Sequence, residues 1–358
     1  EYCPCGSWNL FGGVACSIAA FLLAPYLPDS RPQSCFLDVV SINQANEEKM
    51  LQGIYGLGGF LKASRELRIL WSPPYLSRLW CIFELAAFRS ANPAGIITLA
   101  PLCLEAAVAA FWLGGYATMC VFLAVLGLTG SYSILALIPA LLPLFLVLHC
   151  LRRTLSMKQQ LFADLEGFDL DKAYCRKESD RDFVLKAIIE WYGSLESFTA
   201  YVRGPLQQEL QAMHSTTRLP LHYSFLIVTP VVSFGLDALL ALWLAGAPTQ
   251  IVLSYGIGVV LGLCTCWAMI AVHLSTLLCS YSISTNSSIM GWMQSLIVFL
   301  IFGAVTFAGV KVGALAYTNS LEASCIWLAG AVCLLWLVQG GLQHLQALFK
   351  QCKHRTDA

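Results

Sequence analysis

The sequence predicts a mostly α-helical, multi-pass membrane protein of about seven spans, with a small α/β insert and a second, helical polar segment. Three observations predict this class. Hydrophobic residues make up 58% of the chain and charged residues 12%. The mean hydropathy of +0.68 is too high for a soluble domain, whose surface must be wetted. Long apolar runs recur along the chain, and most charges lie in two stretches between them.

Seven apolar runs are long enough to cross about 30 Å of hydrocarbon as helices. They cover residues 9–27, 103–129, 131–150, 222–246, 250–276, 291–316 and 324–346. Short uncharged connections predict hairpins between the second and third runs and between the fourth and fifth. The first run is too long and too weakly basic at its start for a cleaved secretory signal, so we expect an anchor.

Basic residues predict the orientation. The segments are an N-terminal segment with the first span (1–27), the insert (28–102), a transmembrane hairpin (103–150), an amphipathic helical segment (151–221), a four-span region (222–346) and a polar tail (347–358). Of 21 Lys and Arg residues, seven lie in the insert, ten in the amphipathic segment and three after residue 346. The positive-inside rule therefore places the polar segments on the cytoplasmic or topologically equivalent side. The sequence indicates no organelle.

Cysteine, histidine and net charge exclude several classes of function. Nine of the 15 cysteines lie in or at the ends of apolar runs, where Cys packs as a small apolar residue, and no Cys/His spacing matches a zinc site. A net charge of zero provides no basic excess for a nucleic-acid partner. Four histidines lie near the ends of spans: His149, His222, His273 and His344. They are interfacial side chains or, as the alternative, haem ligands on facing helices.

Asp237 is the one acid far from either end of its predicted span. A charge at that depth costs about 2.5–3.5 kcal/mol on insertion scales, which makes Asp237 a functional candidate. Lys311, late in the sixth span, is the partner that depth suggests. We favour a structural ion pair or a hydrogen-bonded Asp237 over an ion pathway, because a transport site normally contains several such groups.

The insert alternates predicted strands and helices. We expect strands at 35–40, 67–72 and 96–100, a glycine-weakened helix at 50–64, and a helix at 77–87 with Ser77 as its N-cap. This order implies parallel strands with right-handed crossovers, and therefore an α/β domain.

The most specific motif follows the second predicted strand. It consists of Ser72, Tyr75, Trp80, Cys81, Glu84 and Leu85. These residues reproduce the pattern S-x-x-Y-x4-W-C-x2-E-L of plant-type Toll/interleukin-receptor (TIR) domains. Residues 38–44 resemble the D-x-x-C-I-N-Q signature of fungal heterokaryon-incompatibility domains. Together with segment 183–192 and the multi-span layout, the chain resembles TIR-like membrane proteins of dinoflagellate algae.

The resemblance implies NAD⁺ cleavage or signalling. In catalytic TIR domains the glutamate that matches Glu84 contacts the ribose, and its carboxylate stabilises the oxocarbenium-like transition state of nicotinamide release. The resemblance makes Glu84 the catalytic candidate and Tyr75, Ser77 and Trp80 the cofactor-binding candidates, with Trp80 packing its helix against the sheet. The family's opening strand and last elements are not visible in the sequence. An interaction module with Trp80 and Leu85 in its core is therefore favoured over the NAD⁺-cleaving enzyme.

The second polar segment, 151–221, reads as amphipathic helices. Residues 179–182 form a capping box before a helix with Phe183, Ala187, Ile188 and Trp191 on one face. A second short helix, 193–201, is expected to be closed by Gly204-Pro205. We expect this apolar stripe to pack against another surface: the insert, the membrane surface or a partner protein.

Three functions are open. The first is a membrane-anchored TIR-like signalling module that contacts the lipid bilayer and associates with proteins, or with itself, through the insert and the amphipathic segment. The second is a non-catalytic accessory subunit of a larger membrane complex. The third is a transporter or channel centred on Asp237. The resemblance implies NAD as a possible cofactor, haem remains the alternative for the histidines, and no other metal site is predicted.

Overall fold

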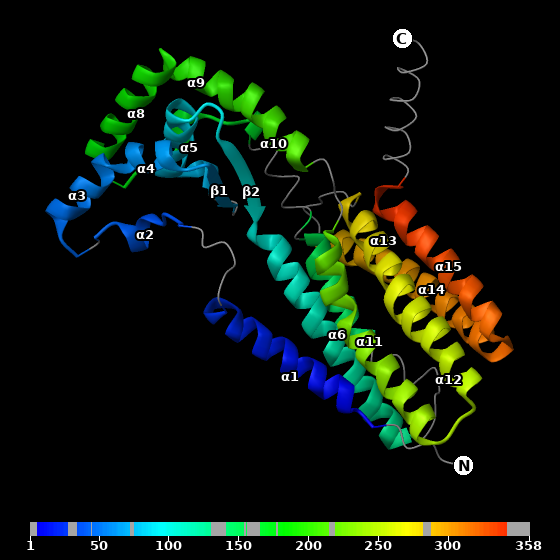
Figure 1. Ribbon diagram of the computed structural model, residues 1–358. Helices are drawn as coiled ribbons and strands as arrows, with labels where there is room; N and C mark the ends of the chain where they lie inside the picture. Colours follow the sequence, from blue (N-terminus) through cyan, green and yellow to red (C-terminus); the bar gives the residue numbers. More distant parts are fainter. Residues whose placement is uncertain are drawn as a thin grey trace, which may run out of the picture. The chain divides into compact units, whose positions relative to one another are not determined.

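The computed structural model describes residues 6–27, 34–43, 45–71, 75–129, 141–153, 155, 165–176, 178–214, 219–281 and 288–341. The chain forms two compact units (Figure 1). The membrane unit comprises Glu1–Tyr26, Ala106–Ser156 and Thr217–Ala358. The polar unit comprises Leu27–Glu105 and Met157–Thr216. Two stretches that are distant in sequence, the insert and most of the amphipathic segment, thus fold together.

In its described residues the membrane unit consists of helices and short connections between them. Its elements are α1 (Trp8–Leu23), η1 (Ala24–Tyr26), α6 (Leu102–Thr129), an unlabelled helix at 141–153, α11 (Leu221–Leu244), α12 (Thr249–Tyr255), η5 (Gly256–Trp267), α13 (Ala268–Ser280), α14 (Ser288–Asn319), α15 (Leu321–Trp336) and η6 (Leu337–Gly341). Six helices in the described part are long and apolar enough to cross a membrane: Trp8–Tyr26, Leu104–Val125, Leu221–Leu244, Thr249–Ser280, Ile289–Asn319 and Leu321–Gly340. The predicted run 131–150 begins outside the described residues.

The span Thr249–Ser280 is the most enclosed of the six, since 61% of its most apolar stretch is buried inside the protein. Indole hydrogen bonds connect it to its neighbours. Trp267 Nε1 donates to the Val305 carbonyl of α14 at 2.9 Å, and Trp327 Nε1 of α15 donates to the Gly258 carbonyl at 3.0 Å. Each bond satisfies a polar group that lipid could not.

Gly309 of α14 provides a test of this packing. A Cβ at Gly309 would overlap the Trp267 ring, whereas a Cβ at Gly303 on the same helix would meet nothing within 4 Å. We expect Gly309→Ala to lower the free energy of unfolding by about 1–3 kcal/mol through overpacking. Gly303→Ala should be neutral or stabilising by up to about 1 kcal/mol through helix propensity. Thermal unfolding of the two purified variants is the measurement, and equal midpoints would contradict this packing.

The polar unit contains a small sheet and several helices. Its elements are α2 (Asp38–Ser41), α3 (Glu47–Tyr55), α4 (Leu57–Ala63), β1 (Glu66–Trp71), η2 (Tyr75–Ser77), α5 (Leu79–Ala91), β2 (Ile96–Pro101), η3 (Leu170–Lys172), α8 (Glu178–Tyr192), α9 (Leu195–Tyr201), η4 (Val202–Leu206) and α10 (Gln207–His214). Strands β1 and β2 are parallel and in register from Glu66↔Ile96 to Trp71↔Pro101. Because α5 connects them, the second and third predicted strands do form a parallel βαβ unit.

One core unites the two polar segments. Ile69 and Ile97 are buried on one face of the sheet, while Leu70 and Ile96 on the other face are 56% and 58% exposed. The buried core contains residues of α4, β1, α5, β2, η3, α8, α9, η4 and α10. Figure 1 shows α8, α9 and α10 following one another across this unit. The apolar side of the amphipathic segment therefore packs against the insert.

The strand predicted at 35–40 is wrong. Residues 34–37 are irregular, and α2 begins at Asp38. The amides of Val40 and Ser41 donate to the Leu37 carbonyl, and the Ser41 hydroxyl accepts from the Leu37 amide. These local bonds close a helical turn, an alternative to strand pairing that serine side chains favour. The described sheet consequently has two strands instead of three.

Three helix boundaries also differ from expectation. The helix predicted at 50–64 is divided at Gly56 into α3 and α4. Helix α8 begins at Glu178, so Ser179 lies inside its first turn. Gly204-Pro205 does not end the second short helix, because the chain continues through the π-helical η4 into α10. A wide π turn accommodates proline, which lacks the amide of a normal helical turn.

Candidate functional site

Helix α5 carries the motif and lies in the centre of the polar core. Seven of its residues are buried: Leu79, Ile82, Phe83, Leu85, Ala86, Ala87 and Phe88. Leu85 is a core residue, as predicted, at 2% exposure. The motif helix is thus mainly a packing element, and the polar chemistry of the motif is limited to the partly buried positions between these residues.

Ser77 does not cap α5. The N-cap position is Arg78, whose side chain makes no capping bond, and Ser77 lies in η2 as an exposed residue. The backbone of the second polar segment satisfies this helix end instead. The Leu79 amide donates to the Tyr174 carbonyl at 3.0 Å, and the Tyr174 amide donates to the Ser77 carbonyl at 2.6 Å. Because Tyr174 is distant in sequence, no local pattern indicates it.

Tyr75 and Glu84 lie within electrostatic reach of each other. The Tyr75 hydroxyl donates to the Cys81 carbonyl of α5 at 3.4 Å. Burial raises the pKa of Tyr75 well above its ordinary value, and the negative charge of Glu84 raises it further. Tyr75 is therefore a neutral phenol at physiological pH, beside a partly buried carboxylate.

Trp80 belongs to an aromatic cluster between α5 and α8. Its ring lies 5.4 Å from Phe83 and 6.4 Å from Phe183, and Phe83 lies 5.4 Å from Trp191. Trp80 thus packs against α8, whereas the resemblance suggested that it packs its helix against the sheet. The predicted helix face of Phe183 and Trp191 is confirmed as a packing face, although these two rings remain 36% and 38% exposed.

The described residues fit NAD⁺ incompletely. A dinucleotide site requires a carboxylate for the ribose and groups for the pyrophosphate and the bases. Glu84 supplies a suitable carboxylate, but the Tyr75 hydroxyl is directed to a backbone carbonyl and Trp80 is packed among aromatic rings. Of the predicted cofactor-binding residues, only Ser77 is exposed.

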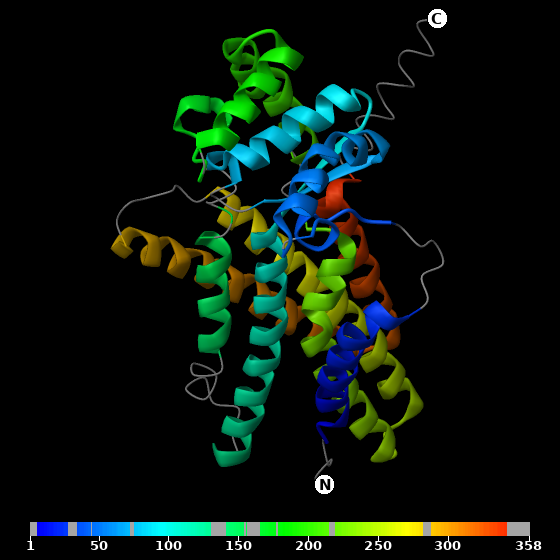
Figure 2. The same cartoon turned by 90° about the vertical axis from the view of Figure 1, so that its left-hand side faces the viewer.

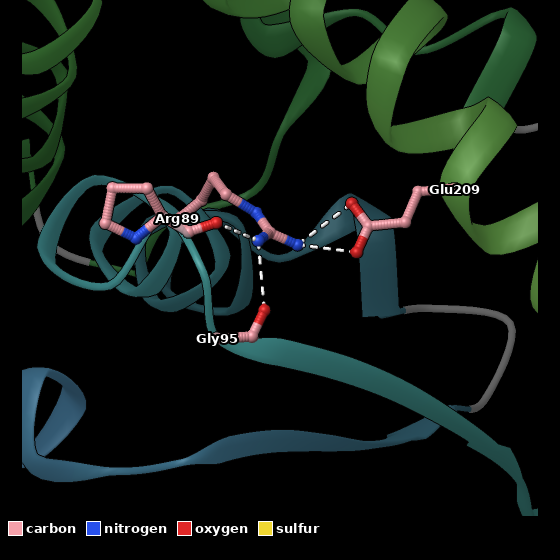
Figure 3. A network of polar contacts seen from close by, with 4 residues as sticks. Arg89, Gly95 and Glu209 are labelled. Carbon is pink, nitrogen blue, oxygen red and sulfur yellow. Dashed lines mark hydrogen bonds and ion pairs between the residues drawn. The ribbon is translucent and has the colours of Figure 1, made fainter.

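Arg89, at the end of α5, organises a network that the sequence did not predict (Figure 3). Its Nη2 donates to both carboxylate oxygens of Glu209 in α10, at 2.6 and 2.9 Å. Its Nη1 donates to the carbonyls of Pro93 and Gly95 at 2.8 and 3.0 Å. Arg89 therefore joins α5, the turn before β2 and the second polar segment. Since 120 residues separate the ion pair, neither periodicity nor spacing could indicate it.

Asp237, in the membrane unit, caps the beginning of α1. Its Oδ1 accepts from the Asn9 amide at 2.8 Å and from Asn9 Nδ2 at 3.1 Å, and its Oδ2 accepts from the Leu10 amide at 3.0 Å. A carboxylate at a helix N-terminus accepts hydrogen bonds from amides that have no acceptor within the helix. Its negative charge also interacts favourably with the positive end of the helix dipole. The expected partner Lys311 is exposed, with Nζ 5.3 Å from the Phe307 ring centre. Asp237 therefore accepts three hydrogen bonds from the beginning of α1.

Two of the four candidate histidines, His149 and His273, are engaged with other side chains. His273 is buried, and its Nε2 lies 3.1 Å from Ser224 Oγ and 3.0 Å from Gln339 Nε2. His149 is stacked on Trp292 with 3.8 Å between ring centroids, and His222 is exposed. His344 lies outside the described residues. The described part contains no group of three or more His, Cys, Asp or Glu residues that could hold a metal ion.

No protein-family model, curated protein or solved structure matches this chain. The TIR-like resemblance therefore rests on the motif residues, most of which lie on or beside α5.

Proposed function

We propose that the chain is an integral membrane protein whose polar unit acts as a protein–protein interaction module of the signalling kind suggested by its TIR-like motif. Both polar segments then lie on the cytoplasmic or equivalent side, as their basic residues suggest. The module is discontinuous, because a transmembrane hairpin separates its two stretches in sequence. Membrane anchoring concentrates such modules in two dimensions and favours association between copies.

One observation carries the proposal: α5 is used as core, while large apolar side chains remain at the surface of α8. Phe183, Ile189 and Trp191 of α8 are 36%, 44% and 38% exposed. On this helix Phe183 and Trp191 border the face through which Val184 and Ile188, both fully buried, enter the core, whereas Ile189 lies on the other side of α8. Large apolar side chains that stay exposed on a domain surface are typical of an interface. We take a second copy of the chain as the partner.

The first test measures self-association of the full chain in lipid vesicles by energy transfer between donor- and acceptor-labelled protein. Ile189→Arg introduces a charge at the exposed apolar surface, and Gln208→Arg introduces the same charge at an exposed position of α10. We expect Ile189→Arg to weaken association by about tenfold or more, as loss of an interface anchor does, and Gln208→Arg to leave it unchanged. Equal association of both variants and the parent chain would overturn the proposal.

A second measurement separates the module from an enzyme. Nicotinamide release from NAD⁺ is followed for the parent chain and Glu84→Gln at concentrations that permit association. The proposal expects no turnover that depends on Glu84. An activity present in the parent chain and lost in Glu84→Gln would identify an NAD⁺-cleaving enzyme instead. Stoichiometric copurification of foreign membrane subunits, without self-association, would favour the accessory-subunit alternative.

A further inference from the structure

A second polar feature lies in the membrane unit, where the helix at 141–153 crosses the beginning of α14. Figure 2 shows this helix in green and α14 in orange. Arg152 near the end of the first helix is only 6% exposed. Its Nε donates to Ser295 Oγ at 2.9 Å and its Nη1 to Gln294 Oε1 at 3.1 Å. Both partners belong to α14 and both are uncharged.

Arg152 is a buried cation without a counter-ion in the described part of the chain. An arginine has five N–H donors, and two of them are used by Ser295 and Gln294. None of the described ion pairs includes Arg152. Guanidinium stays charged in proteins, and burial of an unpaired charge is strongly unfavourable. Neutral hydrogen-bond partners orient the group, but they leave its charge uncompensated.

The surroundings of Arg152 favour an anion at this point. Nη2 lies so close to Gly291 that a Cβ there would stand 2.8 Å from it. Gly291 belongs to the first turn of α14, so the guanidinium lies near the positive end of the helix dipole. The helix dipole and the guanidinium therefore provide positive potential at one place. Because α14 has 32 residues, its dipole is fully developed.

The position along the spans identifies the class of anion. Arg152 follows the predicted apolar run 131–150, and Gly291 lies two residues inside the candidate span that begins at Ile289. Trp292 is 43% exposed and stacked on His149, an amphipathic arrangement typical of the membrane–water boundary. At that depth the abundant anions are lipid phosphates, which arginine binds with paired, charge-assisted hydrogen bonds.

We propose that Arg152, beside the beginning of α14, forms a binding site for the phosphate of an anionic phospholipid headgroup. Ser295 and Gln294 hold the guanidinium in place, and its remaining N–H donors bind the phosphate oxygens. Gly291 leaves the space that the guanidinium occupies. The exposed Arg153, next in sequence, adds electrostatic attraction for the phosphate but is not part of the hydrogen-bonded site. The site does not depend on the interaction role proposed for the polar unit.

The test measures lipids retained by the detergent-purified full chain after equilibration with equal amounts of phosphatidylglycerol and phosphatidylcholine, by native mass spectrometry. We expect the parent chain to prefer phosphatidylglycerol by about tenfold or more, as charge-assisted hydrogen bonds imply. Arg152→Gln should abolish this preference, whereas the matched charge removal Arg153→Gln should preserve most of it. Equal loss in both variants would indicate diffuse attraction and overturn the site.

Gly291→Ala provides a variant that retains the Arg152 charge. The added methyl group displaces the guanidinium, so we expect the preference for phosphatidylglycerol to fall although the net charge is unchanged. Retention of the full preference in Gly291→Ala, with loss in Arg152→Gln, would show that charge alone suffices and would overturn the geometry. Displacement of the lipid by millimolar inorganic phosphate would assign the site to a soluble phosphate instead of a headgroup.

Discussion

Arg89→Met is expected to lower the free energy of unfolding of the polar unit by about 1–3 kcal/mol, because it leaves the hydrogen-bond partners of a partly buried arginine without their donor. The Arg89 side chain is 15% exposed and that of Glu209 33%. Methionine retains much of the apolar volume of arginine. The loss in free energy of unfolding therefore reflects the missing hydrogen bonds and ion pair, not lost packing. The substitution leaves the Glu209 carboxylate and the carbonyls of Pro93 and Gly95 without their donor.

The measurement is backbone hydrogen exchange of α5 and α10 in the full chain, because a two-unit protein does not unfold in one step. Arg68→Met is the matched control. Arg68 pairs with Glu66 on the strand surface, with side-chain exposures of 63% and 34%, and such pairs contribute about 0–1 kcal/mol. Similar exchange rates in the two variants would show that the Arg89 network does not join the two polar segments.

Asp237→Leu is expected to release the beginning of α1 from α11. The substitution removes the acceptor of the Asn9 and Leu10 amides and of the Asn9 side chain. Hydrogen bonds to a charged group contribute about 1.5–3 kcal/mol each, and an apolar environment offers no replacement. We expect exchange of these two amides to accelerate by about a hundredfold, which corresponds to about 2.7 kcal/mol.

Two further variants sharpen this test. Asp237→Asn keeps one acceptor oxygen and loses the charge, so its effect should be intermediate. Thr318→Ala removes an exposed hydroxyl that bonds only to carbonyls of its own helix, and it should leave α1 unchanged. If Asp237→Asn abolished ion flux across vesicles while Asn9 exchange stayed slow, Asp237 would be a transport residue and the structural role proposed here would be wrong.

Local pattern predicted the elements that depend on local forces. The parallel strands around Leu67–Trp71 and Ile96–Ala100 and the amphipathic α8 are present close to their expected positions. The prediction of a strand at 35–40 was wrong because its apolar composition is compatible with a strand or a helix. The Ser41 hydroxyl favours the helical turn. The helix end at Gly204-Pro205 failed because a π turn accommodated the proline.

The candidate site was predictable only in part. The motif correctly placed Leu85 in the core, because spacing along one helix determines which of its positions are buried. Spacing could not indicate that Trp80 contacts Phe183 or that Asp237 caps α1. Each of these contacts joins residues separated by about a hundred positions or more. At such separations the entropy of closing the loop hardly differs from one possible partner to the next, so the sequence does not indicate which pair forms.

Composition and hydrophobic runs by themselves determined that this chain has membrane-competent helices with two polar stretches, because apolar length and charge are properties of the chain. Only the tertiary structure decided that the two stretches share one core, with Arg89 and Glu209 paired across it. It also decided that Asp237 accepts amides of α1, whereas Lys311 stays exposed. The physical reason is that a buried polar group takes whichever complementary group the packing brings to it, regardless of separation in sequence.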